Sequence, residues 1–65
     1  MYEKIYEKFL YLLKINNVSA SKVADEIGIS RSIFTNWKQK KSVPKLDTLQ
    51  KIAEYFGVGI EYFLN

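Results

Sequence analysis

The chain has 65 residues, a formal net charge of +3, and neither cysteine nor histidine. This length allows one domain with a small core, which we expect to span residues 1–65. The missing cysteine excludes disulfides and thiolate metal sites, and the missing histidine removes the commonest general base and metal ligand. We therefore expect that the chain is not an enzyme and binds neither a cofactor nor a metal. The apolar runs are too short to cross a bilayer and residues 1–8 lack a signal-peptide pattern, so we expect a cytoplasmic protein.

The first predicted helix runs from about Tyr2 to Asn16, and Asn17 ends it because asparagine tolerates the left-handed conformation found there. Its inward residues recur at helical spacing: Ile5, Phe9, Leu12 and Leu13. Further apolar residues cover the rest of its circumference and cannot all reach so small a core: Tyr2, Tyr6, Leu10, Tyr11 and Ile15. These residues either lie flat on the surface, as amphipathic tyrosines do, or form a surface for self-association or another protein.

Residues 19–37 contain two short apolar-periodic segments separated by Gly28, which predict helices over about 20–27 and 31–38. Ser19 and Ser30 stand where an N-cap hydroxyl accepts a hydrogen bond from an otherwise unpaired backbone N–H. Gly28 follows Ile27, where a left-handed residue would end the first of these helices. Two helices joined by a tight glycine turn are typical of a DNA-binding helix-turn-helix.

The helix predicted over 31–38 has two unlike faces. Ile33, Phe34 and Trp37 make its apolar side, which predicts that Trp37 is a core residue. The opposite side is an arc of about 140° that bears a guanidinium, an amide and two hydroxyls but no carboxylate. Its four residues are Arg31, Ser32, Thr35 and Asn36. Arginine pairs with guanine and asparagine with adenine through two hydrogen bonds each, so this face is suited to reading base edges.

After this helix, Pro44 keeps Val43 out of the helical conformation, so 40–44 is predicted as a loop. A fourth helix follows and ends at Gly57. Its apolar stripe consists of Leu46, Leu49, Ile52, Ala53 and Phe56. Gly59 is expected to cap a final short helix that runs to about Leu64. Since no segment alternates as a strand, the expected fold class is all-α, a compact five-helix domain.

Positive charge is concentrated in one part of the chain. Residues 31–45 hold five cations and no acid, a local charge of +5, whereas residues 46–65 hold three acids and one lysine, a net of −2. A cationic block is typical of a surface that binds a polyanion, although a solvated basic loop has the same composition. Because the block begins at the polar helix face, we interpret it as DNA-binding.

Together these motifs resemble the Cro/repressor-type helix-turn-helix family of phage repressors and related bacterial regulators. The resemblance covers nearly the whole chain from Phe9. It rests on Val-Ser-Ala-Ser-Lys-Val-Ala at 18–24, Ile-Gly-Ile-Ser at 27–30, Arg-Ser-Ile at 31–33, Asn-Trp-Lys at 36–38, Pro44, Leu49, Ile52-Ala53, Phe-Gly-Val at 56–58 and Glu-Tyr-Phe-Leu at 61–64. It implies a lambda-repressor-like fold, with the third helix in the major groove and the second across the DNA backbone.

The resemblance also implies site residues. Four match base-contacting positions: Arg31, Ser32, Thr35 and Asn36. A second set matches positions near the sugar-phosphate backbone: Ser19, Ala20, Ser30, Lys38, Lys40, Lys41 and Lys45. Two positions depart from the family pattern, because members often have a long polar residue in place of Ala20 and glycine in place of Lys40. We therefore expect either a positive φ at Lys40 or a different path of the loop.

The sequence thus predicts a sequence-specific double-stranded DNA-binding domain of a transcriptional regulator, most simply a repressor of phage or prophage type. One alternative is an antitoxin-type regulator that binds DNA and, through the first helix, a protein toxin. Another is a protein-interaction module that no longer binds DNA. We expect a pseudo-palindromic operator bound by a homodimer that is weak or absent in free solution. We also expect the chain to be the DNA-binding part of a longer protein.

Overall fold

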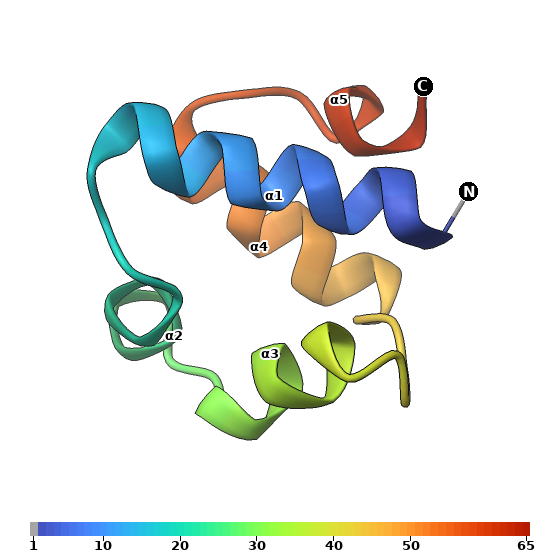
Figure 1. The fold of residues 1–65 in the computed structure, drawn as a ribbon. Helices are drawn as coiled ribbons and strands as arrows, with labels where there is room; N and C mark the ends of the chain where they lie inside the picture. The colour runs from blue at the N-terminus through green and yellow to red at the C-terminus, as the bar shows by residue number, and fades with distance from the viewer. Residues whose placement is uncertain (1) are drawn as a thin grey trace.

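The computed structural model describes the backbone of residues 2–65 and the side chains of residues 4–65. Five helices follow one another: α1 (Tyr2–Asn16), α2 (Ala20–Ile27), α3 (Arg31–Lys38), α4 (Leu46–Phe56) and α5 (Glu61–Leu64). Residues 2–65 contain no strand, which confirms the expected all-α fold (Figure 1). No described helix is long and apolar enough to span a bilayer.

The helices pack around one apolar core, whose centre is Trp37 with 0% of its surface exposed. The ring of Phe9 from α1 stacks on Trp37 at 5.1 Å and on Phe34 at 4.8 Å, measured between ring centroids. The other core residues are Leu12, Val23, Ala24, Leu49, Ile52, Ala53 and Phe63, and Pro44 is buried as well. Since Trp37 joins the apolar side of α3 to α1, it is a core residue, as the sequence predicts.

The predicted capping residues lie at the ends of the helices. The Ser19 hydroxyl accepts a hydrogen bond from the Lys22 N–H at 3.1 Å, and the Ser30 hydroxyl accepts one from the Ser32 N–H at 3.2 Å. Gly28 is left-handed with a φ of +78° and ends α2. Asn17 and Gly57 are also left-handed, with φ values of +55° and +72°. These local signals mark both ends of α2, the start of α3 and the ends of α1 and α4.

Two expectations about the second half of the chain are wrong. Gly59 is not the N-cap of α5, because this helix begins one residue later with Ile60 at its cap. The reason is a tight first turn, in which the N–H groups of Tyr62 and Phe63 bond three residues back, to Gly59 and Ile60. Leu46 is not part of the buried stripe of α4 and is 59% exposed, since it is the first residue of the helix, directly after the loop.

The arrangement of the helices exposes the outer side of α3. In Figure 1, α1 runs across the molecule with α5 on one side, and α2 and α3 lie together at the opposite end. The C-terminus is tied to α1 because Lys8 Nζ donates to the Asn65 carbonyl at 2.6 Å and the Tyr62 hydroxyl donates to the Lys8 carbonyl at 3.4 Å. The outer side of α3 therefore lies away from α5 and the C-terminus.

The apolar residues of α1 outside the predicted inward stripe differ in how far they are buried. Tyr6 is half-buried, with its ring edge-on to Trp37 at 5.2 Å between centroids. Leu10, Tyr11 and Ile15 remain exposed. The side chain of Tyr2 lies outside the described residues.

Candidate nucleic-acid interface

The turn between α2 and α3 sets the direction of α3. The N–H groups of Gly28 and Ile29 both bond to the Ala24 carbonyl at 3.0 Å, which closes α2 and reverses the chain. Both helices bury two residues in the core, Val23 and Ala24 on α2, and Phe34 and Trp37 on α3. Because the apolar side of α3 is held in the core, its polar side faces outward.

Four residues of α3 were predicted to contact bases, and the structure brings them onto this outward side. Arg31, Ser32 and Thr35 are exposed, and Asn36 is half-buried. Two of the hydroxyls already have partners within the protein. The Thr35 hydroxyl donates to the Arg31 carbonyl at 3.4 Å, and the Ser32 hydroxyl shares a hydrogen bond of 2.8 Å with the Ser30 hydroxyl.

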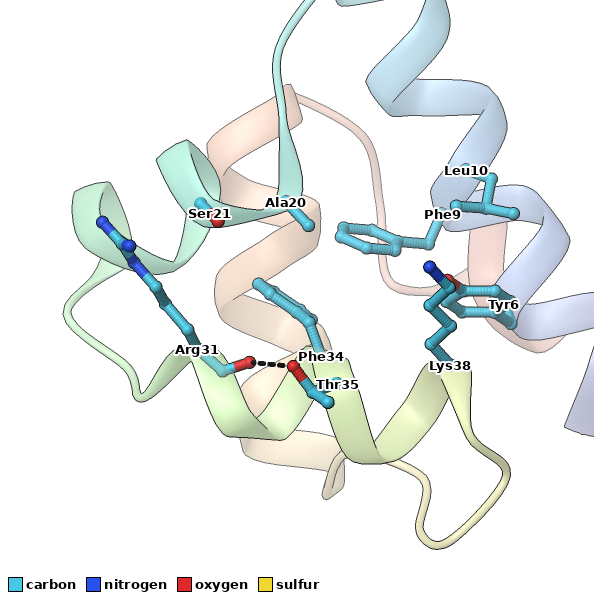
Figure 2. A pocket seen from close by; sticks show the side chains of 9 residues that line it. All are labelled: Tyr6, Phe9, Leu10, Ala20, Ser21, Arg31, Phe34, Thr35 and Lys38. Carbon is cyan, nitrogen blue, oxygen red and sulfur yellow. Dashed lines mark hydrogen bonds between the residues drawn. The ribbon is translucent and has the colours of Figure 1, made fainter.

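A hollow of about 140 Å³ lies on one side of this face (Figure 2). Phe9, Phe34 and other apolar side chains form its floor, and three helices line it: Tyr6, Phe9 and Leu10 on α1, Ala20 and Ser21 on α2, and Arg31, Phe34, Thr35 and Lys38 on α3. Ala20 reaches only a short way into this space, where members of the family often have a long polar side chain. The departure at Ala20 therefore leaves room beside the first turn of α3.

A groove lies on the other side of the same face. Ile33 and Asn36 of α3 line it together with the loop after α3 and the start of α4, which contribute Ser42, Val43, Pro44, Lys45 and Thr48. Three of the four predicted base-contacting residues line these two spaces, Arg31 and Thr35 along the hollow and Asn36 along the groove, whereas Ser32 lines neither. Each space also has a predicted phosphate-contacting lysine, Lys38 at the hollow and Lys45 at the groove.

The loop after α3 takes the first of the two paths that the sequence allows. Lys40 has a φ of +62°, so it adopts the left-handed conformation at the position where the family often has glycine. Its N–H bonds to the Trp37 carbonyl at 3.0 Å, and the Lys41 N–H bonds to the Asn36 carbonyl at 2.8 Å. These bonds close the end of α3. Lys38, Lys40, Lys41 and Lys45 are all exposed.

The remaining predicted phosphate-contacting residues lie at the starts of two helices. Ser19 precedes α2, Ala20 is its first residue, and Ser30 precedes α3. The serine hydroxyls are occupied as caps. Backbone N–H groups in the first turns are then the groups offered to an anion, since the first turn of a helix lacks internal acceptors for them.

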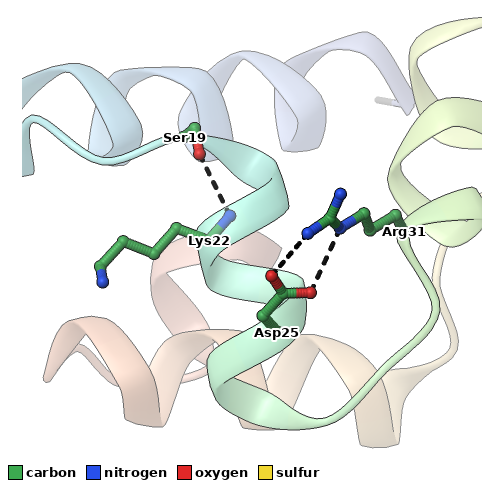
Figure 3. Close-up of polar contacts among 4 residues, drawn as sticks. All are labelled: Ser19, Lys22, Asp25 and Arg31. Atoms are coloured by element: carbon green, nitrogen blue, oxygen red, sulfur yellow. Dashed lines mark hydrogen bonds and ion pairs between the residues drawn. The ribbon is translucent and has the colours of Figure 1, made fainter.

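One feature of the face was missed by the sequence analysis. Although α3 itself has no carboxylate, Asp25 on α2 supplies one, with Oδ2 at 2.7 Å from Arg31 Nη2 and Oδ1 at 3.2 Å from Arg31 Nε (Figure 3). The pair is exposed to solvent. The hydrogen bond from Arg31 holds the pKa of Asp25 below its usual value, and the same bond raises the pKa of Arg31. The polar side of α3 itself has no carboxylate, as predicted, but the contact from α2 places one beside it.

Gln39 was also missed as a candidate. It is exposed and stands at the C-terminal end of α3, one helical turn beyond Thr35 on the polar side. The helical period that selects Thr35 from Arg31 also selects Gln39 from Thr35. A glutamine amide has the donor and acceptor that pair with adenine.

The fold and this face define the chain as a helix-turn-helix protein. A sequence model described as a helix-turn-helix domain matches residues 6–65, and the chain belongs to that family. It is similar to the HTH-type transcriptional activator BcrR of Enterococcus faecalis, with 27% identity over 59 residues. That match covers 91% of this chain but 29% of the relative, so the chain spans less than a third of the relative's length. No solved structure matches the chain.

Proposed function

We propose that the chain binds double-stranded DNA with sequence specificity, as the DNA-reading part of a transcriptional regulator. The observation that carries the proposal is the outward polar face of α3, which combines Arg31 and Asn36 with a lysine on each flank. An α-helix with its side chains is about 10–12 Å across, so α3 fits the major groove, which is about 12 Å wide. Phosphates border that groove on both sides, where Lys38 and Lys45 would meet them.

The experiment begins with selection of bound sites from random duplexes, followed by titration of variants on the selected and on a scrambled duplex. Arg31→Ala and Asn36→Ala should each cost about 1–3 kcal/mol on the selected duplex and much less on the scrambled one. Lys51→Ala, an exposed cation of α4, is the matched surface control and should change neither affinity. Equal losses on both duplexes would show that Arg31 and Asn36 do not read bases.

A regulator bound at a promoter either represses or activates transcription. We infer repression, as the resemblance to phage repressors predicts, because a domain bound at a promoter blocks it without a second contact, whereas activation needs a surface for the transcription machinery. The E. faecalis relative is named as an activator. A reporter downstream of the selected site should lose expression when the chain is present. A gain in expression would assign activation instead.

A second candidate function is that of an antitoxin-type regulator, which binds a protein toxin as well as DNA. The exposed Tyr11 and Ile15 on α1 favour it, because neither lines the hollow or the groove beside the polar face of α3, and that face would stay free for DNA. Purification of the chain from its own cells tests this function. A stoichiometric toxin that is released by Tyr11→Glu would support it, and a chain that purifies alone would exclude it.

A further inference from the structure

The ion pair between Asp25 and Arg31 places an acid at the candidate interface, where it opposes the binding of DNA. A carboxylate repels the phosphates that the surrounding lysines attract. Exposed ion pairs contribute little to stability, so the stability of the fold does not explain why an acid lies here.

The positions of the two residues in their helices do not explain the pair either. Asp25 lies in the last turn of α2, where the negative end of the helix dipole disfavours an anion. Arg31 is the first residue of α3, where the positive end disfavours a cation. Each charge is thus poorly placed in its own helix, and the two are brought together only across the turn at Gly28.

The geometry of the pair leaves part of the guanidinium available. Asp25 engages the edge formed by Nε and Nη2, and Figure 3 shows the third nitrogen, Nη1, directed away from the carboxylate. A guanidinium has five N–H donors, so the edge formed by Nη1 and Nη2 retains a parallel pair. Guanine presents two acceptors, O6 and N7, side by side in the major groove, and such an edge fits them.

We propose that Asp25 is a positioning residue that fixes the guanidinium of Arg31 for guanine. The carboxylate orients the guanidinium plane before DNA arrives and competes with phosphates for the Nε edge, so that the Nη edge meets a base. Held in this way, Arg31 selects guanine. Without Asp25, Arg31 is free to contact a phosphate, which carries no sequence information. This inference rests on the proposed function and adds to it a partner for Arg31 and a base.

The test compares Asp25→Asn with wild type on the selected duplex and on duplexes in which each guanine in turn is replaced by adenine. At one position, wild type should prefer guanine, and Asp25→Asn should lose about fivefold or more of that preference, the lower end of what a bidentate pair supplies. Its affinity for a scrambled duplex should be unchanged or higher. In an Arg31→Ala background, Asp25→Asn should have no effect on the preference.

Glu26→Gln is the matched control, because it removes the same charge from the neighbouring exposed residue of α2. It should tighten binding to all duplexes slightly and leave the preference for guanine intact. If Asp25→Asn behaves like Glu26→Gln, Asp25 only competes with DNA and the proposal is overturned. If wild type shows no preference among duplexes, the proposed function itself fails, and the role of Asp25 fails with it. Circular dichroism confirms that each variant is folded.

Discussion

The backbone at Lys40 is strained, since an L-residue at a φ of +62° places its Cβ close to the carbonyl oxygen. Lys40→Gly removes that strain and should raise the free energy of unfolding by roughly 0.5–1 kcal/mol, after the greater flexibility of glycine in the unfolded chain is counted. Urea denaturation measures the change. Gln39→Gly is the control, because Gln39 has an ordinary φ of −85° and its replacement should destabilise. A loss of stability in Lys40→Gly would contradict the left-handed conformation.

The ionisation of Asp25 reports whether the pair with Arg31 forms in solution. Its hydrogen bond to Arg31 lowers the pKa of Asp25, so the carboxylate should titrate below about 3.9, the value expected in the unfolded chain. The stabilisation that this pair provides is therefore complete above pH of about 4 and is lost as the pH falls through the lowered pKa. Carbon-detected NMR titration of the carboxyl group measures the midpoint. Arg31→Gln should raise that midpoint, and equal midpoints in the two proteins would show that no pair exists.

At the scale of the helices, most of the fold follows from signals that are local in the sequence. Ser19, Gly28 and Ser30 act through bonds to residues two to four positions away, so their effect is visible without knowledge of the fold. The buried side of α3 follows in the same way from its helical period. The N-cap of α5 does not, because a tight turn of three-residue bonds moves the start of the helix by one position.

The candidate site was less predictable than the helices that hold it. A helical period places Arg31, Thr35 and Asn36 on one face, but it does not describe what lies across a turn. Asp25 reaches Arg31 from another helix, and the angle between α2 and α3 determines that contact. The division of the face between a hollow and a groove also depends on α1, which is distant in the sequence, and on the path of the loop before α4.

The lysines at the end of α3 and in the loop after it are expected to raise the affinity for DNA. Lys38, Lys40, Lys41 and Lys45 are exposed around the reading face, and each true phosphate contact releases counterions. Replacing one of them with glutamine should weaken binding to all duplexes alike and reduce the slope of log K against log salt by about 1. Titrations at several salt concentrations measure the slope, with Lys51→Gln on α4 as the control. An unchanged slope in the double variant Lys38→Gln/Lys45→Gln would remove these flanking lysines from the interface.

The size of the whole molecule bears on how two copies would bind. Its principal extents are 25 × 23 × 21 Å, smaller than the separation of about 34 Å between recognition helices on successive turns of DNA. Two copies therefore fit side by side on a pseudo-palindromic site without overlap. We predict a monomer or weak dimer in free solution and pairing on DNA, through the C-terminal end where Leu64 is exposed.

Sedimentation of the free chain and titrations on half and full sites test this prediction. Binding to the full site should be cooperative, and Leu64→Glu should reduce the cooperativity without weakening binding to a half site. Equal affinity per half site in both settings would mean that this chain has no functional dimer surface.

The most direct test of the central claim, that α3 enters the major groove, is an NMR spectrum of the isotope-labelled chain bound to its selected duplex. We expect intermolecular NOEs from side-chain protons of Arg31, Thr35 and Asn36 to cytosine H5 or thymine methyl protons, which lie in the major groove. Backbone shifts should be largest in α3, at the start of α2 and in the loop at 39–45. Contacts confined to the exposed side of α1 at Leu10, Tyr11 and Ile15, with α3 unshifted, would contradict it.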